Sequence, residues 1–332
     1  MVQEARGTQA APERPGLAAI REAAGRIAGH VCHTPLIETA LPGCAEALHL
    51  KLETRQPTGS FKLRGATNAV RALPEEVRAL GLVTASTGNH GRALAYAARE
   101  AGTRATICMS RLVPENKVAA VRALGAEIRI CGASQDEAQE DVARLVAREG
   151  LTEIPPFDHP AIIAGQGTIG LEIAAALPTL SLMLVPLSGG GLAAGVAAGI
   201  KALLPSVRVV GVSMERGAAM QASLAASHPV CVTEERSLAD SLGGGIGLAN
   251  RYTFAMCREL LDEIVLLSEA EIAAGVAWLG RTQGEVVEGA GAVGVAALLA
   301  GKVRAEGPAV AVLSGGNIDP ALHARIMNGE TS

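Results

Sequence analysis

Residues 56–66 read Gln56-Pro57-Thr58-Gly59-Ser60-Phe61-Lys62-Leu63-Arg64-Gly65-Ala66. In this segment Lys62 stands between an aromatic residue and a turn of small residues, where we expect a strand to give way to a helix. Partial desolvation at such a junction lowers the pKa of an amine and makes it a nucleophile toward an aldehyde. An ordinary solvated lysine beside a helix N-terminus is the alternative interpretation, because most lysines are surface charges.

The composition is that of a globular enzyme with ample core. The chain has 332 residues, of which 49% are hydrophobic and 19% are charged, so it can form two domains or one large one. The formal net charge of −4 gives no reason to expect nucleic acid or an anionic membrane as a partner.

The cysteines and the apolar segments restrict the class of protein further. Six cysteines are scattered without a Cys-x-x-Cys pair, which predicts neither a zinc site nor a disulfide framework and fits a reducing, cytoplasmic compartment. Residues 1–16 are polar, so we expect a disordered tail and no secretory signal. The most apolar tract, residues 173–200, is interrupted by Pro178, Pro186 and a run of glycines, and a membrane span is not expected.

Hydrophobic patterning predicts an α/β protein. A helix is expected over residues 17–27 and a strand over 48–52, and from residue 81 onward strands and helices alternate as in parallel sheets with crossover helices. We expect a large domain of residues 1–80 and 158–330, a small mobile domain of residues 81–157, and a ligand in the crevice between them. The other expected strands are 82–85, 104–109, 127–131, 182–187, 207–212, 264–267 and 309–313, and the other expected helices are 92–101, 116–124, 135–148, 167–177, 192–203, 252–261, 269–283, 290–300 and one at the C-terminus.

Three glycine-containing turns follow expected strands, at residues 86–91, 188–192 and 314–317. Glycines ahead of a helix leave backbone N–H groups free for an anion, so residues 188–192 are a candidate phosphate cradle. They also fit a tight turn that needs positive φ. Gly189-x-Gly191-x-x-Ala194 matches a loose dinucleotide fingerprint as well, with Glu215 in the ribose-binding position, which leaves an NAD-binding protein as an alternative.

The turn at residues 86–91 has two possible roles. The hydroxyls of Ser86 and Thr87, with the N–H groups of a helix start, suit a carboxylate, but they equally suit helix N-capping. His90 is more often a structural histidine than an acid or base in such a position. Ser314 likewise fits a strand-end cap.

Taken together, these segments resemble the fold-type II pyridoxal-phosphate (PLP) enzymes of the threonine and serine dehydratase family, over about residues 25–328. The resemblance implies two parallel-sheet domains of the tryptophan synthase β-subunit type. It is based on Ser60-Phe61-Lys62-x-Arg64-Gly65-Ala66, Ser86-x-Gly88-Asn89-His90, Gly189–Gly191, Glu288 within residues 287–292, and Ser314-Gly315-Gly316-Asn317. Residues 56–59, 86–92 and 237–247 resemble the hydroxyectoine-utilisation dehydratases more closely.

The family resemblance implies a role for each candidate residue. Lys62 would hold PLP as a Schiff base and later move the substrate Cα proton, while Phe61 packs near the ring. Asn89 would hydrogen-bond the ring hydroxyl and Ser314 would meet the pyridine nitrogen. The remaining cofactor-binding residues would be Ser188, Gly189, Gly190, Gly191, Leu192 and Glu288, and the substrate carboxylate would be held by Ser86, Thr87, Asn89 and His90.

The implied reaction is elimination of the β-hydroxyl and then of ammonia from a β-hydroxy α-amino acid, which gives a 2-oxo acid. A racemase or a β-replacement synthase is the alternative within PLP chemistry. Serine racemases have a serine base at the position of Thr87, so Thr87 is a catalytic candidate although its bulk argues against racemisation. Ser213 stands where those enzymes have a metal-binding glutamate, and we expect no metal there. A homodimer is expected from the family.

Overall fold

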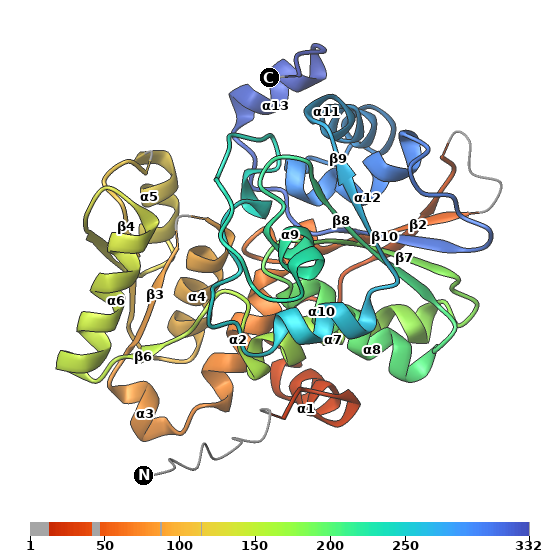
Figure 1. Cartoon of the computed structure of the whole chain (residues 1–332). Helices are drawn as coiled ribbons and strands as arrows, with labels where there is room; N and C mark the ends of the chain where they lie inside the picture. Colours follow the sequence, from red (N-terminus) through yellow and green to blue (C-terminus); the bar gives the residue numbers. More distant parts are fainter. Residues whose placement is uncertain (1–12, 42–46, 87, 114, 332) are drawn as a thin grey trace, which may run out of the picture.

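The computed structural model describes residues 13–41, 47–86, 88–113 and 115–331 (Figure 1). Most of the expected N-terminal tail, residues 1–12, therefore lies outside the described part. In the described part the chain forms two sheets side by side, each with helices packed on it. Within these ranges no helix is long and apolar enough to cross a membrane.

The larger sheet has six strands in the order β1-β2-β10-β7-β8-β9. β1 runs antiparallel to β2, and the other neighbouring strands of this sheet are parallel. All five residues of β7 and of β10 are buried, as expected for parallel strands that are covered on both faces. The strands are β1 (Leu36–Thr39), β2 (Leu48–Leu52), β7 (Leu182–Pro186), β8 (Arg208–Met214), β9 (Glu263–Leu267) and β10 (Ala309–Leu313).

Alternate residues of these strands enter two different cores. Leu182 and Leu184 of β7 pack with α11, α12 and α13, whereas Met183 and Val185 pack with α7, α8, α9 and α10. The helices are α1 (Leu17–Ile27), α7 (Pro160–Ala176), α8 (Gly191–Leu203), α9 (Ala219–Ala226), α10 (Thr253–Leu260), α11 (Glu269–Trp278), α12 (Gly289–Leu299) and α13 (Pro320–Met327), with short 3₁₀ segments at Glu53–Arg55 and Asp240–Leu242 and a π segment at Leu279–Gln283.

The smaller sheet has four parallel strands in the order β5-β4-β3-β6. One face packs against α4 and α5, and the other face packs against α6. Its elements are β3 (Leu82–Ala85), α4 (Asn89–Glu100), β4 (Ala105–Met109), α5 (Glu115–Arg122), β5 (Glu127–Ile130), α6 (Gln135–Glu149) and β6 (Thr152–Glu153). They lie within the predicted small domain, whose boundaries remain a prediction.

Helix α2 (Lys62–Ala72) lies between the two halves of the molecule, packed against α7 on one side and α4 on the other (Figure 1). The α2–α7 contact is close enough to need glycine. A Cβ on Gly165 would stand 2.6 Å from the Cα of Gly65. The short helix α3 (Glu75–Ala79) follows and leads into the small sheet.

The expected α/β architecture is confirmed, with differences at particular elements. α7 begins at Pro160, not at residue 167, because Gly165, Gly167 and Gly170 sit at close helix contacts where packing outweighs their low helix propensity. α4 begins at Asn89, three residues earlier than expected. The antiparallel strand β1, the two-residue β6 and the helices α3 and α9 were not predicted. β1, β6 and α3 are too short to give a periodic signal, and α9 consists mostly of small and apolar residues that show little helical periodicity.

Candidate active site

Lys62 lies where the loop after the 3₁₀ segment Glu53–Arg55 meets the loop after β10. Phe61 N donates to the carbonyl of Ser314 at 2.9 Å, and Ser60 and Gly315 form an isolated antiparallel bridge. Lys62 is the first residue of α2. The fold therefore brings the predicted nucleophile and the third glycine turn together, although 250 residues of chain separate them.

The amine of Lys62 is held in a poorly solvated place. Its Nζ donates to the carbonyl of Pro156 at 2.7 Å and lies 5.4 Å from the centre of the Phe61 ring. Burial lowers the pKa of Lys62 to about 8, and the carboxylate of Glu288 partly opposes that shift. The lower pKa favours the neutral, nucleophilic form of the amine relative to a solvated lysine.

The turn after β10 makes a close approach to Glu288. A Cβ on Gly315 would lie 2.6 Å from Glu288 Oε1 and 3.2 Å from Asn89 Nδ2, so only glycine fits at this position. Glu288 N donates to the Gly315 carbonyl at 3.1 Å, and Glu288 is the N-cap residue of α12. Burial raises the pKa of Glu288 to about 7, with the nearby charge of Asp240 as a second cause. Ser314 is buried in the same turn.

Asn89 is held by a chain of polar contacts that crosses between the two halves. Its Nδ2 donates to Glu288 Oε1 at 2.7 Å, and its Oδ1 accepts from Asn317 Nδ2 at 2.6 Å. Asn317 also donates to the Thr58 carbonyl and accepts from Arg92 at 3.1 Å. The contributions of Asn317 and Arg92 were not predicted, although Asn317 closes the quoted Ser314–Asn317 motif.

The turn after β3 is organised by Ser86. Its Oγ accepts from the N–H groups of Gly91 at 3.0 Å and Gly88 at 3.4 Å, so the hydroxyl caps the start of α4. Gly88 is the N-cap residue of α4, so Ser86 acts from two residues before the cap, and its hydroxyl proton is left available to a ligand. Thr87, the neighbouring candidate, lies outside the described residues.

His90 is buried beneath the same turn. Its Nε2 lies 2.8 Å from the carbonyl of Ile154, and burial lowers the pKa of the imidazole to about 3, with the charge of Lys62 as a second cause. A neutral ring whose Nε2–H donates to that carbonyl leaves Nδ1 as an acceptor. Nδ1 is buried and has no partner among the described residues.

The glycine turn between β7 and α8 has the form of an anion site. Gly190 has φ +90°, and a Cβ there would clash with Met220, Cys257 and Thr253, whose nearest atoms would lie at 2.8–3.0 Å. Phe157 lies over the same turn, since a Cβ on Gly189 would come within 2.5 Å of its ring. α8 begins at Gly191, so the free N–H groups of its first turn adjoin this cradle. Ser188 at its entrance is partly exposed, and Leu192 is buried.

Several buried polar atoms next to Lys62 lack a hydrogen-bond partner within the described residues. They are Thr58 Oγ1 and Ser60 Oγ on one side and His90 Nδ1 on the other. Buried polar groups in native proteins are nearly always paired, so such a group of unpaired atoms beside a nucleophile is typical of a ligand site.

A buried network of charges supports α2 directly behind Lys62. Arg64 donates to both carboxylate oxygens of Glu53 at 2.8 Å and to Glu172 at 2.6 and 2.9 Å. Lys51 pairs with Glu172 and donates to the Thr34 carbonyl. Burial alone would raise the pKa of Glu53, but the Arg64 guanidinium outweighs it and holds that pKa below its usual range. Periodicity gave no signal for this network, because Glu53 and Arg64 read as surface charges.

The comparisons with known proteins agree on one family. Residues 27–315 match the family described as "Pyridoxal-phosphate dependent enzyme". The chain is 61% identical over 318 residues to "Putative threonine dehydratase" of Sinorhizobium fredii, covering 94% of this chain and 95% of that protein. It is 43% identical over 282 residues to "L-threonine ammonia-lyase" of Thermotoga maritima, covering 85% and 70% respectively.

A solved structure is similar over nearly its full length. Maize serine racemase superposes with a TM-score of 0.88 at 31% identity, covering 95% of this chain and 98% of that one. Because 95% of this chain is covered, the likeness includes both sheets.

Proposed function

The chain belongs to the pyridoxal-phosphate-dependent enzymes, and on that premise we propose that it is an ammonia-lyase that acts on threonine or a closely similar β-hydroxy α-amino acid. The products would be ammonia and the corresponding 2-oxo acid. The observation that carries the proposal is Lys62, whose amine has a lowered pKa and lies where the loop before α2 meets the turn after β10. Family membership decides against an NAD-binding protein.

The residues around Lys62 fit PLP. The cradle of Gly189, Gly190 and Gly191 at the start of α8 suits a phosphate, and the unpaired atoms of Thr58, Ser60 and His90 suit a polar ligand. Ser314 would face the pyridine nitrogen and Asn89 the ring hydroxyl. When bound, PLP supplies an aldehyde that reacts with amines and a conjugated ring that accepts the electron pair left at Cα.

Side chains of the protein would carry out proton transfer and hold the substrate carboxylate. We propose that Lys62 Nζ removes the Cα proton, for which an amine with a pKa near 8 is well matched at neutral pH. The hydroxyl proton of Ser86, with Thr87 and the N–H groups at the start of α4, would hold the substrate carboxylate. Because the imidazole of His90 is neutral, it would contribute a hydrogen bond there and no charge.

The choice of substrate is tested by product formation. The purified holoenzyme is incubated with threonine, serine and a 3-hydroxylated diaminobutyrate derivative, and ammonia and 2-oxo acid are measured together. Equimolar release from threonine supports the proposal. Release only from the diaminobutyrate derivative would instead support the role in hydroxyectoine breakdown that residues 237–247 suggest.

A second candidate function is amino-acid racemisation, favoured by the likeness to maize serine racemase. Chiral chromatography of the same reactions separates the two. Formation of D-serine or D-threonine without ammonia would contradict the ammonia-lyase proposal and support the racemase.

We also propose that the protein is a cytoplasmic homodimer in which the segment of residues 81–157 closes over the substrate. Support for closure comes from the exposed ion pair between Lys117 of α5 and Asp240 at 3.2 Å, a contact between the two halves that can break without exposing a packed core. Light scattering of the purified enzyme measures the oligomeric state directly, and a monomeric mass would contradict the dimer.

A further inference from the structure

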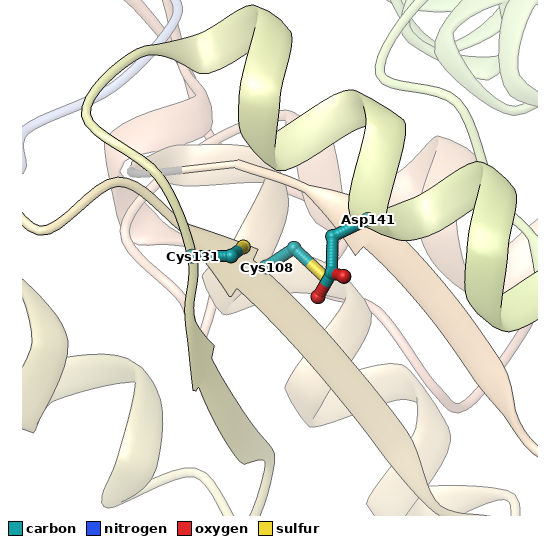
Figure 2. Close-up of side chains that lie close together, drawn as sticks. All are labelled: Cys108, Cys131 and Asp141. Atoms are coloured by element: carbon teal, nitrogen blue, oxygen red, sulfur yellow. The ribbon is translucent and has the colours of Figure 1, made fainter.

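Away from Lys62, three potential metal ligands come together on the α6 face of the small sheet. Cys108 lies on β4, Cys131 directly follows β5, and Asp141 lies on α6 (Figure 2). One ligand atom from each residue lies within 4.8 Å of the other two, and Cys108 Sγ is 4.0 Å from Asp141 Oδ2. Cys108 and Cys131 are 23 residues apart in the sequence, so the cluster could not be predicted from a Cys-x-x-Cys spacing.

From this convergence we propose that Cys108, Cys131 and Asp141 bind a borderline-soft divalent cation of the zinc type. Two sulfurs and one carboxylate oxygen are ligands that Zn²⁺ accepts, and a water molecule can complete a tetrahedron. The proposal revises the expectation, drawn from cysteine spacing alone, that the chain has no metal site.

The separations fit such a site with little movement. With Zn–S of about 2.3 Å and Zn–O of about 2.0–2.2 Å, the ligand atoms of a tetrahedral site lie about 3.5–3.8 Å apart. To bind the ion, the distance between Cys108 Sγ and Asp141 Oδ2 would have to shorten by a few tenths of an ångström. The other distances between ligand atoms would have to shorten by at most about one ångström. Figure 2 shows the side chains of Cys108 and Asp141 directed toward each other, with Cys131 beside them.

The surrounding charges compensate for the ligands. Asp141 accepts from Arg129 at 2.7 Å and from Arg144 at 2.7 Å, and both arginines are about half exposed. Two thiolates and one carboxylate exceed the charge of a divalent cation by one negative unit, which the two arginines offset. Binding by two thiols releases two protons to solvent, and no electron is transferred. Cys131 is partly exposed and offers a path of entry, whereas Cys108 is fully buried.

A disulfide between the two cysteines is the competing use of the cluster, and the structure favours the metal. A disulfide needs the sulfurs about 2.05 Å apart. A disulfide would use only the two sulfurs, whereas a metal site also uses the Asp141 carboxylate that lies beside them.

The cluster adjoins the turn that we assign to the substrate carboxylate. The backbone carbonyl of Cys108 accepts a hydrogen bond from Ser86 N at 3.2 Å. A cation that ties β4 to α6 would thus fix the strand on which the Ser86 turn rests.

The test uses the PLP-loaded enzyme, dialysed against a chelator and then gel-filtered. Cobalt(II) is the spectroscopic probe, because tetrahedral thiolate coordination gives intense visible bands at wavelengths longer than PLP absorbs. We expect those bands at one cobalt per chain, and we expect Zn²⁺ to displace them. Cys131→Ser should weaken binding by more than the roughly 10- to 100-fold that outer-shell changes cost. Cys231→Ser, which removes an exposed cysteine elsewhere, should bind cobalt as the unmodified chain does.

Three results would overturn the proposal. They are the absence of tetrahedral cobalt bands, cobalt binding that Cys131→Ser leaves unchanged, and a Cys108–Cys131 disulfide in the metal-free enzyme by peptide mass mapping. Retained PLP absorbance and an unchanged far-UV circular dichroism spectrum in Cys131→Ser show that this variant is folded, so loss of cobalt cannot be ascribed to unfolding. Because metal binding is read without lyase turnover, its failure is distinct from failure of the proposed reaction.

Discussion

The two sides of the active site are built differently. Behind Lys62, Arg64 and Glu53 form a bidentate ion pair in which neither side chain is more than 1% exposed. At the mouth, the ion pair between Lys117 and Asp240 leaves those side chains 41% and 61% exposed. The charges behind the lysine are locked by burial and multiple hydrogen bonds, whereas those at the mouth are screened by water.

We interpret this difference as a division of roles: the buried side holds the nucleophile in place, and the exposed side lets the substrate enter. A nucleophile that must meet one atom of a cofactor benefits from rigid support, and the buried network supplies that support to the first turn of α2. A substrate has to enter and products have to leave, which requires that the other wall can move. The comparison predicts that changes behind Lys62 have large effects and changes at the mouth small ones.

Removing the amine itself is expected to have the largest effect. Lys62→Ala should lower kcat for ammonia release by about 10⁴-fold or more, since it deletes both the covalent attachment and the proton acceptor. The variant should keep its fold, because the hydrogen bond that it loses within the described residues is the single one from Nζ to the Pro156 carbonyl. Circular dichroism measures the fold of the variant, and an ammonia assay measures its kcat. Activity within 10-fold of the parent would contradict the role of Lys62.

Disrupting the buried ion pairs of Arg64 behind Lys62 is expected to have the next largest effect. Arg64→Met leaves the buried carboxylates of Glu53 and Glu172 without their main partner and should cost about 3–5 kcal/mol of unfolding free energy. Urea unfolding of the parent and the variant gives the value. A loss below about 1 kcal/mol would mean that the buried side of the site is no stiffer than its mouth.

A pH-dependent stability is expected from Glu288 in the cofactor-free protein. Its pKa is raised in the folded state from 4.5 to about 7, so the folded protein holds a proton that the unfolded chain has lost. The stabilisation is complete below about pH 4.5 and is lost as the pH rises through 7. Relative to Glu288→Gln, the parent should lose up to about 3 kcal/mol between pH 5 and 8.

The control for that experiment is Glu259→Gln, which changes an exposed carboxylate on α10. Because this variant retains Glu288, it should show the same loss of stability between pH 5 and 8 as the parent. A Glu288→Gln variant that also runs parallel to the parent would contradict the raised pKa.

The smallest effect is expected at the mouth. Lys117→Met should change the unfolding free energy by less than about 1 kcal/mol, because an exposed ion pair contributes little in water. The same urea titration as for Arg64→Met supplies the number. A loss comparable to that of Arg64→Met would remove the distinction between the two sides.

Sequence patterns were most informative where the signal is local. Buried strands such as β7 and β10 read directly as apolar runs, and the three glycine turns were found because each follows such a strand. The family motif identified Lys62, Asn89 and Ser314. Contacts between distant segments were not visible in this way. Arg64 with Glu53, Asn317 with Asn89, and Cys108 with Cys131 and Asp141 depend on tertiary packing that periodicity does not encode.

The central claim, that Lys62 is the residue that carries the cofactor, is tested most directly by covalent trapping. The PLP-loaded enzyme is reduced with borohydride, digested, and its peptides are mapped by mass spectrometry. The account predicts a pyridoxyl-phosphate mass on the peptide that contains Lys62 and loss of the visible absorbance at the same time. The label on any of the other four lysines, Lys51, Lys117, Lys201 or Lys302, or no label at all, would contradict it.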